Sequence, residues 1–167
     1  MGLHLQQLRE EIALAIGGMS DEQLSRSRNG KWSAAEILEH LSLTYAGSVT
    51  GFHKCLEAGR PLAAAPNTKQ RIAQFVVIDF GHLPKGRLSP TFAVPSGNDR
   101  AKVASEIFSE INRTEDAIAQ CETRFGRTRR LVDHPALGPL TGDQWRKFHL
   151  VHGRHHMKQI RRLRNMA

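Results

Sequence analysis

Apolar residues that recur at steps of three and four constrain the fold of this chain more than any other sequence feature. The longest such run covers residues 33–58, and it predicts one long amphipathic helix. Ser33 with Glu36 forms a capping box that marks its beginning. Gly59 and Pro61 mark its end. The large apolar positions of this run are Ile37, Leu38, Leu41, Leu43, Tyr45, Val49, Phe52 and Leu56.

The same spacing appears in several other segments. It predicts helices over residues 5–16, 68–80, 103–125 and 145–163. Ser20 with Gln23 predicts a short helical turn, and Thr141 with Gln144 forms a capping box before the last helix.

The segments between these helices read as irregular connections. Residues 81–97 hold Pro84, Pro90 and Pro95, and residues 126–140 show no strand-like alternation. Residues 96–99 are expected to cap the following helix. The sum predicts an all-α bundle of four principal helices with a short extra helical segment, folded as one domain over residues 1–167. Both irregular connections are expected to border any pocket.

Composition limits the class of protein. No apolar run approaches the ~18–20 residues that span a bilayer, and residues 1–18 lack the pattern of a signal peptide, so we expect a cytoplasmic protein without membrane contact. The net charge of +8 gathers in residues 124–130 and 154–164. A solvated basic face explains this charge, and nucleic-acid binding is the less favoured alternative. Cys55 and Cys121 lie in predicted helices and are expected to be reduced packing residues.

Three histidines suggest a metal site. His152 and His156 are four residues apart in the last predicted helix, so their Cβ atoms lie about 6 Å apart on one face. His40 lies far upstream in the long helix over residues 33–58. Two ligands from one helix and one from its neighbour would make a three-histidine site with an open position, which is typical of catalytic rather than structural metal sites.

The last helix carries these histidines on a stripe whose ends are apolar and whose middle is polar. A buried stripe of this kind needs partners for its polar groups, and a metal ion would supply them. The alternatives are a solvated histidine pair and a hydrogen-bonded His40 in the core. His149 is a candidate neighbour of the site, while His155 is expected to point about 100° away, towards a different surface. The stripe consists of Trp145, His149, His152, His156, Gln159 and Leu163.

Two motifs resemble the DinB-like superfamily of metal-binding four-helix bundles. The first is KWSAAEILEHL, which holds Trp32, Ser33, His40 and Leu41. The second is LTGDQWRKFHLVHGRHHMKQI, which holds the pair His152 and His156 followed by Gln159. The run HPALGPLTGDQW is closest to uncharacterised DinB-related domains. The resemblance covers the whole chain in order and length.

The resemblance implies that His40, His152 and His156 hold a divalent metal ion, with nickel or zinc as the expected metal. It also implies a metal-dependent enzyme, either a thiol-dependent transferase or a hydrolase, acting on a small-molecule thiol or electrophile, and it implies a homodimer. The alternative is a non-catalytic metal-binding or stress-related module. Glu36 could orient His40 or only cap its helix. Gln159 could hydrogen-bond near the metal or only pair with the other polar groups of the stripe. The sequence identifies no catalytic residue.

Overall fold

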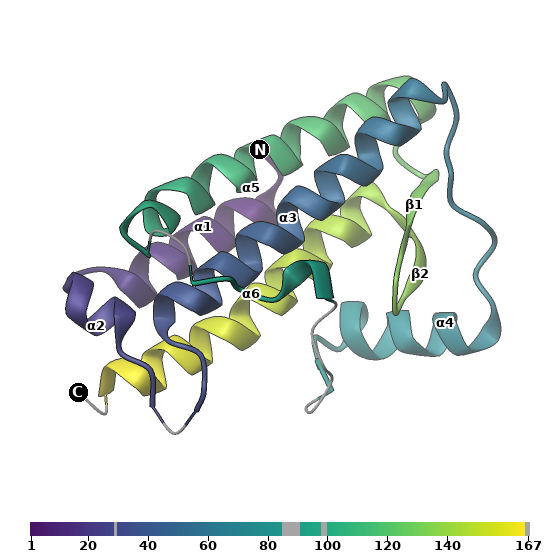
Figure 1. Ribbon diagram of the computed structural model, residues 1–167. Helices are drawn as coiled ribbons and strands as arrows, with labels where there is room; N and C mark the ends of the chain where they lie inside the picture. Colours follow the sequence, from purple (N-terminus) through teal and green to yellow (C-terminus); the bar gives the residue numbers. More distant parts are fainter. Residues whose placement is uncertain (29, 85–90, 98–99, 166–167) are drawn as a thin grey trace.

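Four long helices lie side by side and form the body of the molecule (Figure 1). They are α1 (Leu3–Ile16), α3 (Ala34–Glu57), α5 (Arg100–Phe125) and α6 (Gly142–Asn165). This computed structural model describes residues 1–28, 30–84, 91–97 and 100–165. In it, α3 packs along α5, and α1 packs along α6. The predicted all-α, DinB-like bundle is confirmed, since 69% of the structure is helical.

The predicted capping boxes begin the helices where expected. Ser33 Oγ accepts the backbone N–H of Glu36 at 3.2 Å, and Glu36 Oε2 accepts the backbone N–H of Ser33 at 2.7 Å. Thr141 and Gln144 make the same exchange at the start of α6. A third box opens the short helix α2 (Asp21–Ser25). These reciprocal bonds satisfy backbone donors that a helix otherwise leaves unpaired, which fixes the register of α3 and α6.

The predicted helix over residues 68–80 forms in two parts. The helix α4 (Thr68–Gln74) continues into a π-helical turn, η1 (Phe75–Asp79), which packs on α6 through the buried side chains of Val77 and Ile78 (Figure 1). Gln74 Nε2 donates to the carbonyl oxygens of Leu137 at 2.8 Å and Pro139 at 3.1 Å, which ties α4 to the segment before α6.

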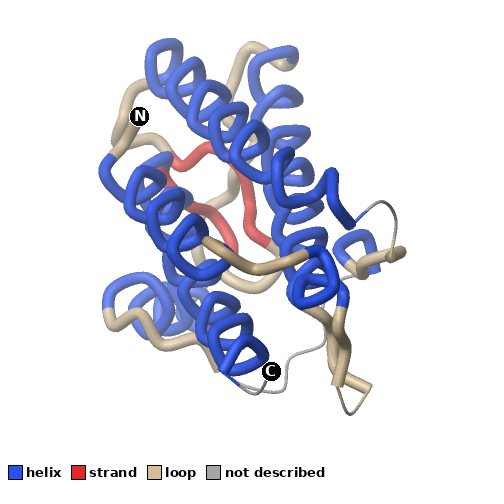
Figure 2. The backbone as a smooth tube through the Cα atoms, turned by 90° about the vertical axis from the view of Figure 1, so that its left-hand side faces the viewer, coloured by secondary structure: helices blue, strands red, loops and turns tan. Residues whose placement is uncertain are grey.

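The prediction of an irregular, strand-free segment before α6 was wrong. The strands β1 (Arg130–His134) and β2 (Gly138–Thr141) form an antiparallel hairpin at one end of the bundle, visible between the helices in Figure 2. His134 pairs with Gly138, and Val132 pairs with Leu140. In β2 three consecutive residues, from Gly138 to Leu140, are buried, so the sequence shows no alternation of apolar and polar residues.

The segment between η1 and α5 is described only in part. Residues 81–84 and 91–97 include a short 3₁₀ turn, η2 (Thr91–Ala93). Ser96, expected to help cap the next helix, instead donates its backbone N–H and its hydroxyl to Glu39 Oε1, at 2.9 and 2.7 Å. The rest of that predicted cap, residues 98–99, lies outside the described residues.

The prediction that the two cysteines are reduced packing residues is borne out by the structure. Cys55 and Cys121 are free and buried, and burial raises the pKa of the Cys121 thiol to about 11. Part of the basic charge on α6 is paired, because Arg154 and Arg161 both contact Glu11 of α1, at 2.9 and 3.1 Å. None of the helices in the described ranges is long and apolar enough to cross a membrane.

Candidate metal centre

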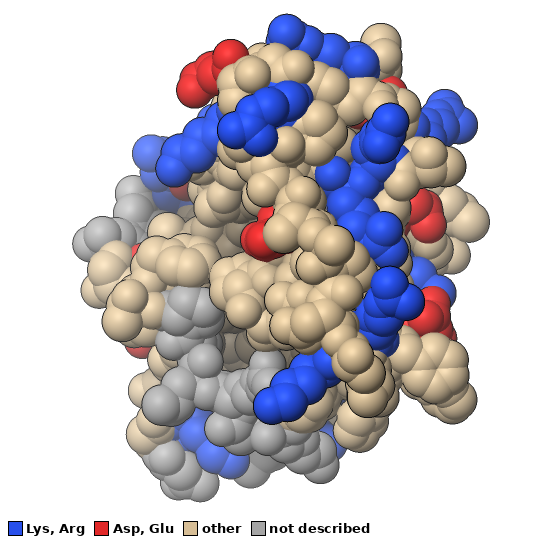
Figure 3. Space-filling model, turned by 90° about the vertical axis from the view of Figure 1, so that its right-hand side faces the viewer, with Lys and Arg blue, Asp and Glu red and all other residues tan. Residues whose placement is uncertain are grey.

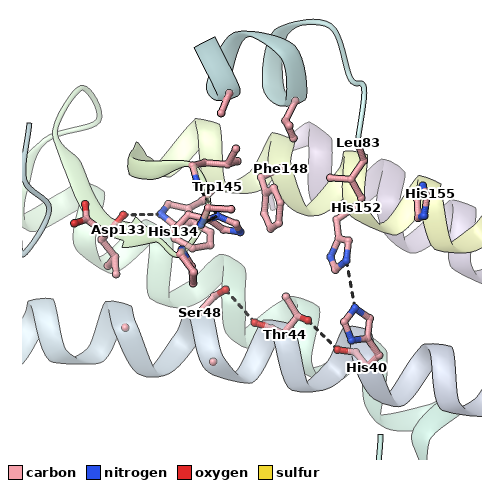
Figure 4. Close-up of a pocket in the computed structure, with 18 of the residues that line it drawn as sticks. His40, Thr44, Ser48, Leu83, Asp133, His134, Trp145, Phe148, His152 and His155 are labelled. Carbon is pink, nitrogen blue, oxygen red and sulfur yellow. Dashed lines mark hydrogen bonds between the residues drawn. The ribbon is translucent and has the colours of Figure 1, made fainter. Parts of the chain in front are cut away.

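The three predicted histidines meet between α3 and α6, and Figure 4 shows two of them, His40 and His152, facing each other. His40 and His156 are buried, and His152 is half-buried between them. The Nε2 atom of His152 lies 3.3 Å from Nε2 of His40 and 3.1 Å from Nε2 of His156. Helical spacing explains the pair on α6, whereas the packing of α3 against α6 brings in His40.

Hydrogen bonds on the far sides of the rings fix two tautomers. His40 Nδ1 donates to the carbonyl oxygen of Ala93 at 2.7 Å, and His156 Nδ1 donates to Gln159 Oε1 at 2.9 Å. Because both acceptors are oxygens, each Nδ1 carries the hydrogen, and the lone pairs of both Nε2 atoms point into the cluster. This is the arrangement of outer hydrogen bonds that orients histidine ligands around metal ions.

The cluster is poorly satisfied by its own hydrogen bonds. His152 Nε2 lies between two lone pairs and can donate one hydrogen to only one of them. Its Nδ1 is buried without a hydrogen-bond partner among the described residues. A tetrahedral ion with bonds of about 2.0–2.1 Å separates its ligand nitrogens by about 3.3–3.4 Å, close to the two separations here. The donor set therefore fits a divalent ion, and the three histidines could hold one.

Burial keeps these imidazoles uncharged. It lowers the pKa of His156, with a further contribution from His40, to about 4. Burial, followed by the neighbours His156 and His40, lowers the pKa of His152 well below its usual value. In His40 burial lowers the pKa although the bond to Ala93 opposes the shift. Neutral imidazole is the form that coordinates metals, so no proton has to be displaced at neutral pH.

A large cavity opens directly from the cluster. Its volume is about 1360 Å³, and all three histidines line it, together with residues of α3, α4, η1, the hairpin and α6. Trp32 packs on the ring of His40 at 5.1 Å, and Phe148 stacks on the ring of His152 at 5.5 Å between centroids. As expected, both irregular connections border it, through Leu83 and Phe92 on one side and residues 132–137 on the other.

The structure resolves several alternatives that the sequence left open. Gln159 bonds a cluster histidine, and the carbonyl oxygen of Ala93 is the group that orients His40. Glu36 caps α3. The orienting carbonyl of Ala93 lies 53 residues from His40 in the chain, and no sequence pattern could have identified it.

The other α6 histidines differ from one another. His149 is fully buried against Tyr45 and Trp145, and burial, with a smaller effect from His134, lowers its pKa to about 3. The expectation that His155 faces a different surface was wrong. It is half-buried, lines the same cavity and accepts a hydrogen bond from Gln159 Nε2 at 3.3 Å.

His134 is a cavity residue that sequence reasoning missed. Its Nδ1 accepts the backbone N–H groups of Ala136 and Leu137, both at 3.1 Å, so Nε2 carries the ring hydrogen. Its ring packs on Phe148 at 4.3 Å, on the side of Phe148 away from His152 (Figure 4). The one sequence signal near this residue was the dipeptide His134-Pro135, which is typical of a turn and does not indicate a cavity.

The fold and the histidine cluster define a helical bundle of the DinB/YfiT-like class. The chain belongs to the family described as "Protein of unknown function (DUF1569)", whose model matches residues 1–163 and which lies in that clan. No curated protein and no solved structure gives a significant match.

Proposed function

We propose that this protein is a divalent-metal-dependent enzyme, a thiol-dependent transferase or a hydrolase, with His40, His152 and His156 as the metal ligands. One observation carries the proposal: three neutral imidazoles turn their Nε2 atoms towards one point on the wall of a large cavity. A divalent ion held there would act as a Lewis acid and lower the pKa of a water or thiol in its open position.

The surrounding residues have distinct roles in this proposal. Gln159 and the carbonyl of Ala93 hold the ligand rings by their Nδ1–H groups, so that the Nε2 lone pairs stay aimed at the ion. Trp32 and Phe148 pack against two of the rings and limit the access of water from the sides. The cavity leaves one side of the cluster open to a substrate.

The alternative is a metal-binding module without turnover. A structural zinc site usually has four protein ligands, whereas only three metal-binding side chains, all histidines, come together here among the described residues. A cavity of about 1360 Å³ beside the cluster exceeds the roughly 300–1,000 Å³ of ordinary small-molecule sites. Both features favour a reaction site.

Metal content tests the proposal directly. We expect untagged protein to carry about one equivalent of zinc or nickel by elemental mass spectrometry, as one three-histidine site implies. The His152→Ala/His156→Ala variant should lose it. The matched control is His53→Ala/His82→Ala, which removes two exposed histidines and should keep the metal. Circular dichroism checks that both variants are folded.

The outcomes separate the alternatives. A wild-type protein that is metal-free and also fails to bind added zinc and nickel would refute the proposal. Equal metal content in the two double variants would refute it as well. Metal-loaded protein is then assayed for hydrolysis of nitrophenyl esters and for transfer of cysteine or glutathione to chlorodinitrobenzene. Turnover that needs the metal supports an enzyme, and its absence with every probe favours the non-catalytic module.

A further inference from the structure

The cavity beside the histidine cluster extends along α3. On α3 it is lined by His40, Thr44, Ser48, Gly51 and Lys54. With a rise of 1.5 Å per residue, the distance along the helix from His40 to Lys54 is about 21 Å. Figure 4 shows the histidine cluster near one end and Asp133 with His134 towards the other. A ligand that fills this space is therefore extended.

The middle of the cavity offers mainly apolar contacts. Its apolar lining includes Val76, Val77, Leu83, Trp145 and Phe148. Two hydroxyl groups face this region from α3, but both donate within their own helix. Thr44 Oγ1 bonds the carbonyl oxygen of His40 at 2.9 Å, and Ser48 Oγ bonds that of Thr44 at 3.0 Å. The middle section therefore favours a hydrocarbon or aromatic body.

The hairpin end of the cavity is positively charged. Lys54 of α3 and Lys69 of α4 both line it and are exposed. Asp133 is the only carboxylate among the described lining residues, and its Oδ1 accepts the backbone N–H of Ala64 at 3.4 Å. Figure 3 shows how Lys and Arg outnumber Asp and Glu on this face of the molecule. This end is suited to an anionic group.

We propose that the cavity takes an elongated, mainly apolar molecule with one anionic group, which Lys54 and Lys69 hold while the opposite end of the molecule reaches the histidine cluster. The proposal rests on the proposed function for the chemistry at that opposite end, but the binding itself does not require metal. Two exposed lysines give modest attraction, so their removal should weaken binding about tenfold. The apolar walls supply the rest of the affinity.

Laurate is the probe, with binding measured by titration calorimetry on metal-free protein. We expect Lys54→Ala/Lys69→Ala to bind laurate about tenfold more weakly than wild type. The variant Lys31→Ala/Lys158→Ala removes the same charge at exposed positions outside the cavity lining and should bind like wild type. Dodecanol should bind more weakly than laurate, and equally to all three proteins. No laurate binding, or equal losses in both double variants, would overturn the proposal.

The orientation is tested on nickel-loaded protein by NMR line broadening of bound laurate. The proposal expects the terminal methyl protons to broaden more than the protons beside the carboxylate, because the methyl end lies near the ion. The reverse order would place the carboxylate at the cluster and refute the proposed orientation. Failure to load both nickel and zinc refutes the proposed function alone, since the metal-free titration stands by itself.

Discussion

Arg146 is the residue whose loss should most clearly reveal what holds α6 in place. Its side chain is only 8% exposed, and it lies between Glu115 and Glu122 of α5 with hydrogen bonds of 2.7 to 3.1 Å. Arg146→Met keeps the apolar stem but leaves the buried carboxylate of Glu115 and the half-buried carboxylate of Glu122 without a cation. Breaking a buried pair in this way costs about 3–5 kcal/mol of unfolding free energy, which corresponds to a fall in Tm of roughly 10 °C.

The loss should also depend on pH. Burial disfavours the charged form of Glu115, but its bond to Arg146 and the charge of Arg146 outweigh burial and lower its pKa. This stabilisation is present above the unfolded pKa near 4.5 and is lost as pH falls through the lower folded value. In the variant, unpaired burial raises the carboxylate pKa, so acid relieves the penalty. The difference in stability between wild type and variant should therefore shrink from pH 7 to pH 4.

Urea unfolding followed by circular dichroism measures this difference at both pH values. The control is Arg154→Met, which breaks a more exposed pair with Glu11 and should cost less than about 1 kcal/mol. A loss below about 1 kcal/mol for Arg146→Met at pH 7, or a difference that stays constant with pH, would refute the reasoning. The outcome bears on the candidate site, because Arg146 fixes α6 about one turn before His149 and about two turns before His152.

Three further changes test the packing around the site. Gly153→Ala would place a methyl group against Leu8 of α1, so we expect a loss of about 1–3 kcal/mol, measured as a lower midpoint of urea unfolding. Gln74→Leu removes two hydrogen bonds that tie α4 to the hairpin, and hydrogen exchange of residues 68–79 should quicken while α1 stays protected. Ser33→Ala removes the cap of α3 and should lower stability by about 1 kcal/mol; an unchanged Tm would contradict that role.

The sequence predicted most of the helical fold because its signals are local. The capping boxes at Ser33 and Thr141 depend on residues three apart, and the structure places both at the start of their helices. The hairpin was missed because its strands have five and four residues and because Pro139 and its neighbours are buried consecutively. Such burial comes from contacts with α4 and α6, which no local pattern records.

Part of the candidate site could likewise be predicted from local sequence signals, and part could not. The proximity of His152 and His156 follows from helical spacing, and the convergence of His40 with them was expected from the DinB-like motifs. The groups around the cluster could not be predicted, since Ala93 and His134 come from connections whose paths depend on the tertiary fold. His155 was misplaced because helical spacing gives its direction on α6 but does not show that the cavity also reaches that edge of the helix.

The position of α4 connects the fold to the proposed chemistry. Val77 of η1, the turn that continues α4, is buried in the same apolar cluster as Phe148 and lines the cavity. The two bonds from Gln74 to the hairpin fix the end of α4 that leads into η1. A three-histidine cluster that faces an extended apolar cavity fits the proposed reaction site better than a sealed cluster would. The hairpin that the sequence did not reveal therefore helps to position one wall of the cavity beside the proposed reaction site.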